Sequence, residues 1–322
     1  MTGIAVPLGE GIHRISLALP PLGPKTVNCY AVEGGDGLTL IDCGVNTRRE
    51  LDVLLEGLRQ VGGDEAALRR LICTHLHFDH MGGAAALLSD HPAEFVMHTS
   101  VTGLVDWYND RDGHREYLVQ LVREHGGPSR ETALMGAVWQ RRSFRGYAVP
   151  PSRPVGDGDR IELGGGRYLE VIHAPGHDRT HICLVDSRTG HLFAGDHILP
   201  RITPFVPYDP DRDALGDYLE SLERIVELDP PRTLPGHGES LDGGGERALQ
   251  IMEHHEERLR VVAKAATGQT TDAWGVMNEV FGAGLDPVSS VLALLETLSH
   301  LEHLARTGRL AKRFEEGLPH YG

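Results

Sequence analysis

The sequence predicts an α/β protein with a helical C-terminal region. Two apolar runs rich in β-forming residues, 27–34 and 37–44, flank a Gly-Gly-Asp-Gly turn, and a helical pattern follows over residues 47–60. From about residue 245 the pattern is helical throughout. Strands that alternate with helices are typical of a layered α/β fold, so we expect a large domain, 1–244, and a small one, 245–322.

The elements of the large domain follow one another in order. The helix over 47–60 places Leu51, Leu55 and Leu58 at helical spacing and ends before a Gly-Gly pair. Further helices are predicted at residues 81–90 and 212–228. Further strands, apolar and bounded by turn residues, are predicted at residues 70–74, 94–98, 160–176, 181–187 and 191–196.

Residues 100–147 interrupt this alternation. They contain two segments, 105–127 and 131–147, that are both consistent with amphipathic helices. This is long for a connection between sheet strands, and long excursions are usually lids or binding elements. We therefore expect a helical, lid-like insertion.

The C-terminal region consists of three predicted helices, 246–266, 271–282 and 287–307, and a short terminal hairpin. This order is typical of a winged-helix-like module. Residues 246–322 carry 8 Lys/Arg against 11 Asp/Glu, a poor balance for a DNA reader. The helices could instead form a homodimer interface or one wall of a cleft.

The composition narrows the partners and the compartment. The formal net charge of the 322 residues is −15, which disfavours nucleic acid because phosphates require a Lys/Arg surface. The first residues lack a basic start followed by an apolar run, and no apolar stretch reaches the roughly 18–20 residues of a membrane span. We expect a cytoplasmic protein that does not bind membranes, whose four single cysteines are reduced and buried.

One stretch, THLHFDHMGG at residues 74–83, directly follows a predicted strand. Imidazole and carboxylate groups are the preferred protein ligands of zinc and related divalent ions. Alternate residues in an extended turn project the same way, so His75 and His77 can share one metal, while Asp79 and His80 point toward a second position. The alternative is a solvated loop that happens to be rich in histidine.

Three more metal-competent side chains stand at comparable places. His177 follows the strand pattern LEVIH, Asp196 follows HLF, and His237 follows the helix at 212–228. Each is flanked by glycine, which lets the backbone turn sharply and approach a metal closely. Together with the first cluster, they predict one site rather than isolated turn residues.

Through these residues the sequence resembles the metallo-β-lactamase superfamily. The family's motifs occur in order over roughly residues 10–240: Asp42 in LIDCG, the His-x-His-x-Asp-His block at 75–80, His177 in PGHD, Asp196 in AGDH and His237 in PGHG. The resemblance implies a four-layer αβ/βα sandwich with two β-sheets face to face and helices outside. The segment LSHLEHLARTGRL resembles the small winged-helix domain of a hydrolase subgroup of this superfamily.

Carried over by position, the resemblance implies two divalent metal ions, with zinc expected and iron or manganese as alternatives. The implied ligands are His75, His77 and His177 for the first ion, Asp79, His80 and His237 for the second, and Asp196 as a bridge. Asp42 would orient a ligating histidine through a hydrogen bond.

The expected chemistry is hydrolysis. Two neighbouring cations lower the pKa of a bridging water, so that hydroxide is available to attack a carbonyl near neutral pH. Asp79 would orient this nucleophile or take its proton. Because the sequence lacks a G-x-S-x-G elbow, a serine mechanism is disfavoured. We expect a small-molecule thioester, ester or lactone as substrate, with glyoxalase-II-like thioesterases as the nearest analogy.

Side chains from the insertion and from the loop after Asp196 are expected near the mouth of the site. The candidates are Trp107, Tyr108, Arg201, Phe205 and Tyr208. Aromatics with arginine would suit an acyl or aryl substrate with an anionic group, such as the thioester of a large carrier. The alternative is that these aromatics pack the insertion onto the sheet.

Two other functions are consistent with the motifs. A phosphodiesterase or ribonuclease of the same superfamily would share the metal site, although the acidic composition counts against it. A non-catalytic metal-binding scaffold would be expected to have lost ligands, whereas all seven are present.

Overall fold

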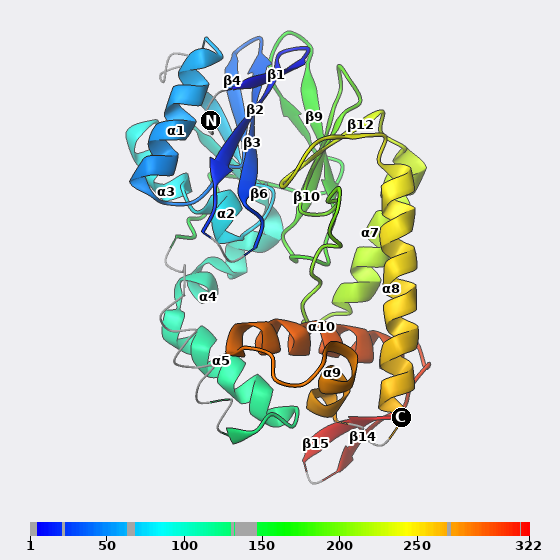
Figure 1. Ribbon diagram of the computed structural model, residues 1–322. Coiled ribbons are helices and arrows are strands. Elements are labelled where there is room, and N and C mark those ends of the chain that lie inside the picture. The colour runs from blue at the N-terminus through cyan, green and yellow to red at the C-terminus, as the bar shows by residue number, and fades with distance from the viewer. Residues whose placement is uncertain are drawn as a thin grey trace.

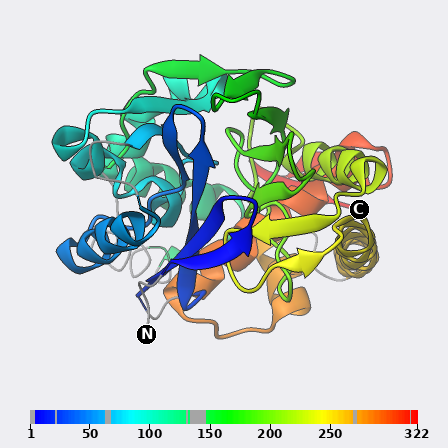
Figure 2. The same ribbon diagram turned by 90° about the horizontal axis from the view of Figure 1, so that it is seen from above.

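A computed structural model describes residues 5–20, 23–62, 68–129, 132, 147–268, 272–315 and 317–322. Two β-sheets face each other, and helices cover the outer face of each sheet (Figures 1 and 2). The apolar side chains between the sheets include Tyr30 and Ile72 from the first sheet and Val171 and Phe193 from the second. The protein therefore has the four-layer αβ/βα arrangement that the sequence predicted.

The first sheet is mixed, with seven strands in the order β1-β2-β3-β4-β5-β6-β7. Its first four strands pair antiparallel, and β4 to β7 pair parallel. The strands are β1 (Val6–Gly9), β2 (Ile12–Ala18), β3 (Thr26–Gly34), β4 (Gly37–Ile41), β5 (Leu68–Ile72), β6 (Glu94–His98) and β7 (Arg153–Val155). The carboxyl ends of β4, β5 and β6 consequently lie at one edge of the sheet, the lower edge in Figure 1.

The second sheet is also mixed, with six strands in the order β13-β12-β11-β10-β9-β8. Only β11 and β12 pair parallel among its described strands. The strands are β8 (Arg160–Glu162), β9 (Tyr168–His173), β10 (Ile182–Asp186), β11 (Leu192–Gly195), β12 (Arg232–Pro235) and β13 (Leu241–Asp242).

Three helices, α1 (Arg48–Gln60), α2 (Phe78–Met81) and α3 (Ala84–Asp90), lie on the side of the first sheet. Thr47 caps α1 because its side chain accepts a hydrogen bond from the backbone N–H of Glu50. The buried face of α1 includes Leu54 and Leu58, which join the core over the outer face of the first sheet. Helical spacing of leucines therefore produced the helix that the sequence predicted.

The outer face of the second sheet packs on α7 (Ala214–Leu228) and α8 (Gly245–Ala266). The same core continues into α9 (Ala273–Phe281) and α10 (Pro287–Arg306), and a hairpin of β14 (Lys312–Glu315) and β15 (Leu318–Tyr321) follows. The predicted helices and terminal hairpin are confirmed. That they form a separate winged-helix domain or a homodimer interface stays a prediction.

The insertion begins with a 3₁₀ turn η2 (Thr99–Gly103) and the helices α4 (Val105–Asn109) and α5 (Arg111–Glu124). Leu118, Leu121 and Val122 of α5 belong to the same core as α7 to α10, so this helix packs beside α10 below the sheets (Figure 1). The second helix expected in the insertion falls almost entirely outside the described residues.

Several strands of the fold were not predicted from the sequence. Strand β2 is a seven-residue partner of β3, and β12 separates the helix at 212–228 from His237. Among the described residues, no helix is both long and apolar enough to cross a membrane.

Candidate metal centre

The His-x-His-x-Asp-His block lies just past the carboxyl end of β5, between the ends of β4 and β6. Residues 75–77 are not helical, and His77 is the extended N-cap residue of α2, which carries Asp79 and His80. The chain therefore changes from an extended segment to a short helix within the block. This change sends the first two histidines and the last two ligand candidates toward different positions.

A first group of ligand atoms comes from three imidazoles. His77 Nδ1 lies 2.9 Å from His75 Nε2 and 3.0 Å from His177 Nε2. His177 comes from the loop after β9, in the opposite sheet. Three imidazole nitrogens that converge from two sheets can hold one metal ion.

A second group comprises Asp79, His80 and His237, whose candidate ligand atoms lie within 4.8 Å of one another. His237 Nε2 is 3.5 Å from Asp79 Oδ2. Asp196 lies between the two groups: its Oδ2 is 3.7 Å from His177 Nε2 and 3.2 Å from His237 Nε2. A carboxylate in that position can contact two ions at once.

The chemistry of these side chains fits a pair of metal ions. His80 Nε2 and Asp196 Oδ1 are buried and have no hydrogen-bond partner, although they are 3.4 Å apart. A buried acceptor without a partner is costly, and a cation between these atoms would satisfy both. Imidazole and carboxylate donors suit zinc and its first-row neighbours.

Hydrogen bonds from other segments orient the imidazoles. His75 Nδ1 lies 3.0 Å from Thr74 Oγ1, and His80 Nδ1 donates to Asp42 Oδ2 at 2.8 Å. His177 Nδ1 and His237 Nδ1 donate to the backbone oxygens of Phe205 at 2.6 Å and Thr26 at 2.7 Å. In each of these four rings the Nε2 atom is left to face the centre, whereas His77 presents Nδ1.

The two groups differ in protonation. Burial, together with the neighbouring His177, lowers the pKa of His77 to about 4. Burial opposes the charged form of His237 as well, but the carboxylates of Asp196 and Asp79 raise its pKa to about 10. His77 is therefore neutral near pH 7, whereas His237 carries a proton that a bound metal ion would displace.

Two glycines of the ligand motifs permit close approach. A Cβ on Gly236 would lie 2.5 Å from Asp196 Oδ1 and 2.6 Å from His80 Cε1. Gly195 has a φ of +48°, and a Cβ there would lie 2.7 Å from His181 Nε2. The PGHG and AGDH motifs thus require glycine on steric grounds, as the sequence suggested.

The five residues predicted to contact substrate lie in different surroundings in the structure. Trp107 packs within the insertion, edge-on to Tyr117, and Tyr108 donates its hydroxyl to Asp178. Arg201 is exposed. Phe205 and Tyr208 are partly buried against the core of the C-terminal helices. Contact of these side chains with substrate stays a prediction.

Three residues at the centre were missed by the sequence reasoning. Thr74 bonds both Asp42 and His75, and Asp178 follows His177 directly. His181 is buried, and its Nε2 accepts from the backbone N–H of Asp196 at 3.1 Å. The only signal in the sequence was their position. Thr74 and Asp178 are adjacent to ligand histidines, and His181 lies four residues after His177.

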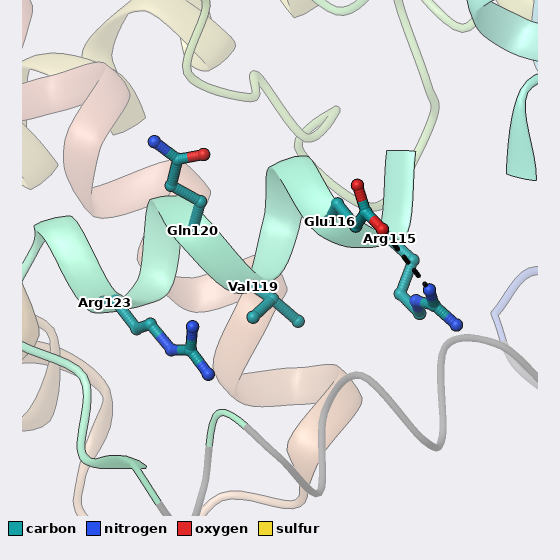
Figure 3. A pocket seen from close by; sticks show the side chains of 5 residues that line it. All are labelled: Arg115, Glu116, Val119, Gln120 and Arg123. Atoms are coloured by element: carbon teal, nitrogen blue, oxygen red, sulfur yellow. Dashed lines mark ion pairs between the residues drawn. The ribbon is translucent and has the colours of Figure 1, made fainter. Parts of the chain in front are cut away.

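A cavity of about 440 Å³ lies on α5, away from these ligands. Figure 3 shows the side chains that line it, Arg115, Glu116, Val119, Gln120 and Arg123, all from one helix. Arg115 and Glu116 form an ion pair at 3.8 Å.

Two facing sheets with adjoining groups of metal-competent side chains are consistent with a binuclear metal site in an α/β protein. Residues 22–237 match the family model "Metallo-beta-lactamase superfamily", and the chain belongs to this superfamily. The two metal-competent groups and the family together make the protein a metal-dependent hydrolase.

Similar proteins cover most of the chain. An acyl-coenzyme A thioesterase, MBLAC2 of Bos taurus, is 31% identical over 274 residues, which cover 81% of this chain and 89% of the relative. The probable metallo-hydrolase YqjP of Bacillus subtilis (strain 168) is 26% identical over 304 residues, 90% of this chain and 91% of the relative.

Two crystal structures resemble the protein over its full length. A metallo-beta-lactamase family protein from Thermus thermophilus has a TM-score of 0.81 and 26% identity, covering 98% of this chain and 99% of its own. A beta-lactamase domain protein from Burkholderia ambifaria has a TM-score of 0.84 and 26% identity, covering 100% of this chain and 94% of its own. The likeness therefore extends to the C-terminal helices.

Proposed function

We propose that the protein is a binuclear zinc hydrolase that cleaves the thioester bond of acyl carriers such as acyl-coenzyme A. The observation that carries this proposal is the position of Asp196, whose Oδ2 faces a ligand nitrogen of each group. The printed activity of the Bos taurus relative supports the thioester class. A small-molecule substrate is also consistent with the net charge of −15.

His75, His77 and His177 would hold the first ion, and Asp79, His80 and His237 the second, with Asp196 shared. Bound metal ions supply a water of lowered pKa and polarise the substrate carbonyl. The substrate reaction is addition of water to the acyl carbon and cleavage of its bond to sulfur, which yields a carboxylic acid and a thiol.

We assign the role of proton acceptor to Asp79. Burial raises the pKa of this carboxyl, but the hydrogen bond with His237 and the nearby imidazoles lower it below its usual range. The group therefore stays a carboxylate near neutral pH, and its oxygens can orient the nucleophilic water and accept its proton. Asp42 would keep the His80 Nε2 lone pair directed at the second ion through its bond to Nδ1.

A hydrolysis panel on protein of known metal content tests the proposal. Acyl-coenzyme A and glutathione thioesters, lactones, aryl esters and a bis-aryl phosphodiester are compared for the wild type and His77→Ala. We expect thioester turnover that His77→Ala abolishes. Turnover of the phosphodiester alone would favour the phosphodiesterase or ribonuclease alternative, and absence of bound metal would refute the proposal.

A further inference from the structure

Two tyrosine hydroxyls connect the insertion to the loops that carry the first group of ligands. Tyr108, on α4, donates to Asp178 Oδ2 at 2.8 Å. Tyr147, near the end of the insertion, donates to the backbone oxygen of Leu76 at 2.9 Å. Leu76 stands between His75 and His77, and Asp178 follows His177 in the sequence. Both hydrogen bonds therefore act on backbone segments that position these imidazoles.

The two tyrosines belong to one connected unit. The side-chain amide of Asn109 donates to the backbone oxygen of Ala148 at 2.9 Å, and the backbone N–H of Ala148 donates to Asn109 Oδ1 at 3.1 Å. This reciprocal pair joins the end of α4 to the end of the insertion. The rings of Tyr108 and Tyr147 pack against the same apolar core. The hydrogen bonds of Tyr108 and Tyr147 to the two ligand loops are consequently coupled through Asn109 and Ala148.

The hydroxyl of Tyr108 completes the hydrogen bonding of a buried carboxylate, that of Asp178. Asp178 is 6% exposed, and its other oxygen accepts from the backbone N–H of Thr180 at 2.7 Å and from its hydroxyl at 2.5 Å. Removing the tyrosine hydroxyl would leave Oδ2 short of a donor next to the His177 segment. A buried carboxylate that loses a donor shifts its loop toward water or another partner.

The second group takes its orienting hydrogen bonds from the sandwich. His80 Nδ1 is held by Asp42 at the end of β4, and His237 Nδ1 by the backbone oxygen of Thr26 in β3. These partners lie in the sheet that α1 to α3 cover, and not in the insertion. The first group shares part of this support, because Thr74 bonds both Asp42 and His75, but only the first group also receives hydrogen bonds from Tyr108 and Tyr147 through its loops.

We propose that Tyr108 and Tyr147 are positioning residues for one metal site, that of His75, His77 and His177, and not for the other. This inference rests on the two-metal assignment proposed above. Loss of either hydroxyl would therefore disturb the ligands of the first ion, whereas His80 and His237 would keep their hydrogen bonds to Asp42 and Thr26.

The test measures the two zinc affinities of metal-free protein by competition with a chelator, for the wild type, Tyr108→Phe and Tyr147→Phe. We expect one affinity to fall about tenfold in each variant and the other to stay unchanged. Nitrogen NMR of ¹⁵N-histidine protein assigns the site, because His77 faces its ion through Nδ1 and the other four histidine ligands through Nε2. The His77 Nδ1 signal should titrate with the weakened zinc.

Tyr117→Phe is the matched control, because it removes a hydroxyl from α5 of the same insertion, where the Tyr117 ring packs edge-on to Trp107. It should match the wild type. Unchanged affinities in Tyr108→Phe and Tyr147→Phe, or an equal fall at both sites, would overturn the inference. A wild type that fails to bind two zinc ions would instead refute the two-metal proposal itself.

Discussion

Asp42→Asn changes one atom and should misdirect one ligand. Asp42 Oδ1 accepts from the backbone N–H of Thr74 at 2.8 Å, and its Oδ2 accepts from His80 Nδ1 at 2.8 Å. In the variant the amide oxygen must face the Thr74 N–H, so the amide NH₂ faces His80. Nδ1 then has to accept, and the proton moves to Nε2, the atom that faces the centre.

The backbone makes asparagine the right substitution. Asp42 has a φ of +58°, a left-handed conformation that asparagine tolerates better than most residues. Burial opposes the charged form of His80, but the Asp196 and Asp42 carboxylates raise its pKa well above the ordinary value, and the variant weakens this effect. Losing such a partner typically lowers metal affinity roughly 10- to 100-fold, about 1.4–2.7 kcal/mol.

Chelator competition with zinc measures the loss at the second site. Asp186→Asn is the control, because Asp186 is also buried but pairs with Arg167 on the second sheet, remote from the ligands. It should lower the free energy of unfolding without lowering zinc affinity. Wild-type affinity for both zinc ions in Asp42→Asn would refute the tautomer argument, and equal losses in the two variants would point to general destabilisation.

Three further predictions concern steric fit, pH and a buried charge. Gly236→Ala should lower zinc stoichiometry after dialysis, since its Cβ would lie 2.5 Å from a carboxylate oxygen of Asp196; full stoichiometry would contradict this. Burial lowers the pKa of His255 to about 3 and of His300 to about 4, so the folded state binds fewer protons than the unfolded chain. The stabilisation that comes from keeping these histidines neutral is fully present above about pH 6.5. As the pH falls from 7 to 5, the free energy of unfolding decreases by about 2 kcal/mol per histidine. Urea unfolding of metal-free protein measures this loss, which should shrink when both histidines become leucine. Arg167→Met should lower the free energy of unfolding by about 3–5 kcal/mol, because it leaves a buried carboxylate unpaired, and replacing both partners should restore most of it.

Local patterns predicted the elements that depend on local chemistry. The helix expected over 47–60 is α1 (Arg48–Gln60), because apolar spacing and a Thr47 cap operate within a few residues. Strand β2 was missed, since its pairing with β3 becomes visible only when the sheet is formed. Tyr108 was expected to contact substrate, yet its hydroxyl bonds Asp178, 70 residues away.

The histidines of the C-terminal helices illustrate the same limit. Their spacing in the sequence does not indicate which residues they contact. In the structure His255 Nδ1 lies 3.2 Å from His300 Nε2, and His303 Nδ1 lies 3.0 Å from Asp213 Oδ2, 90 residues away. Partners at such separations cannot be read from periodicity.

The amino-acid sequence alone established the fold class, the order of the motifs and the seven metal-competent side chains, because each of these is encoded in a short string of residues. The folded chain settled which nitrogen of each ring faces the centre. His237, for example, presents Nε2 because its Nδ1 donates to the backbone oxygen of Thr26, 211 residues earlier. Orientation of an imidazole is set by the partner of its other nitrogen, and that partner is supplied by packing rather than by sequence neighbours.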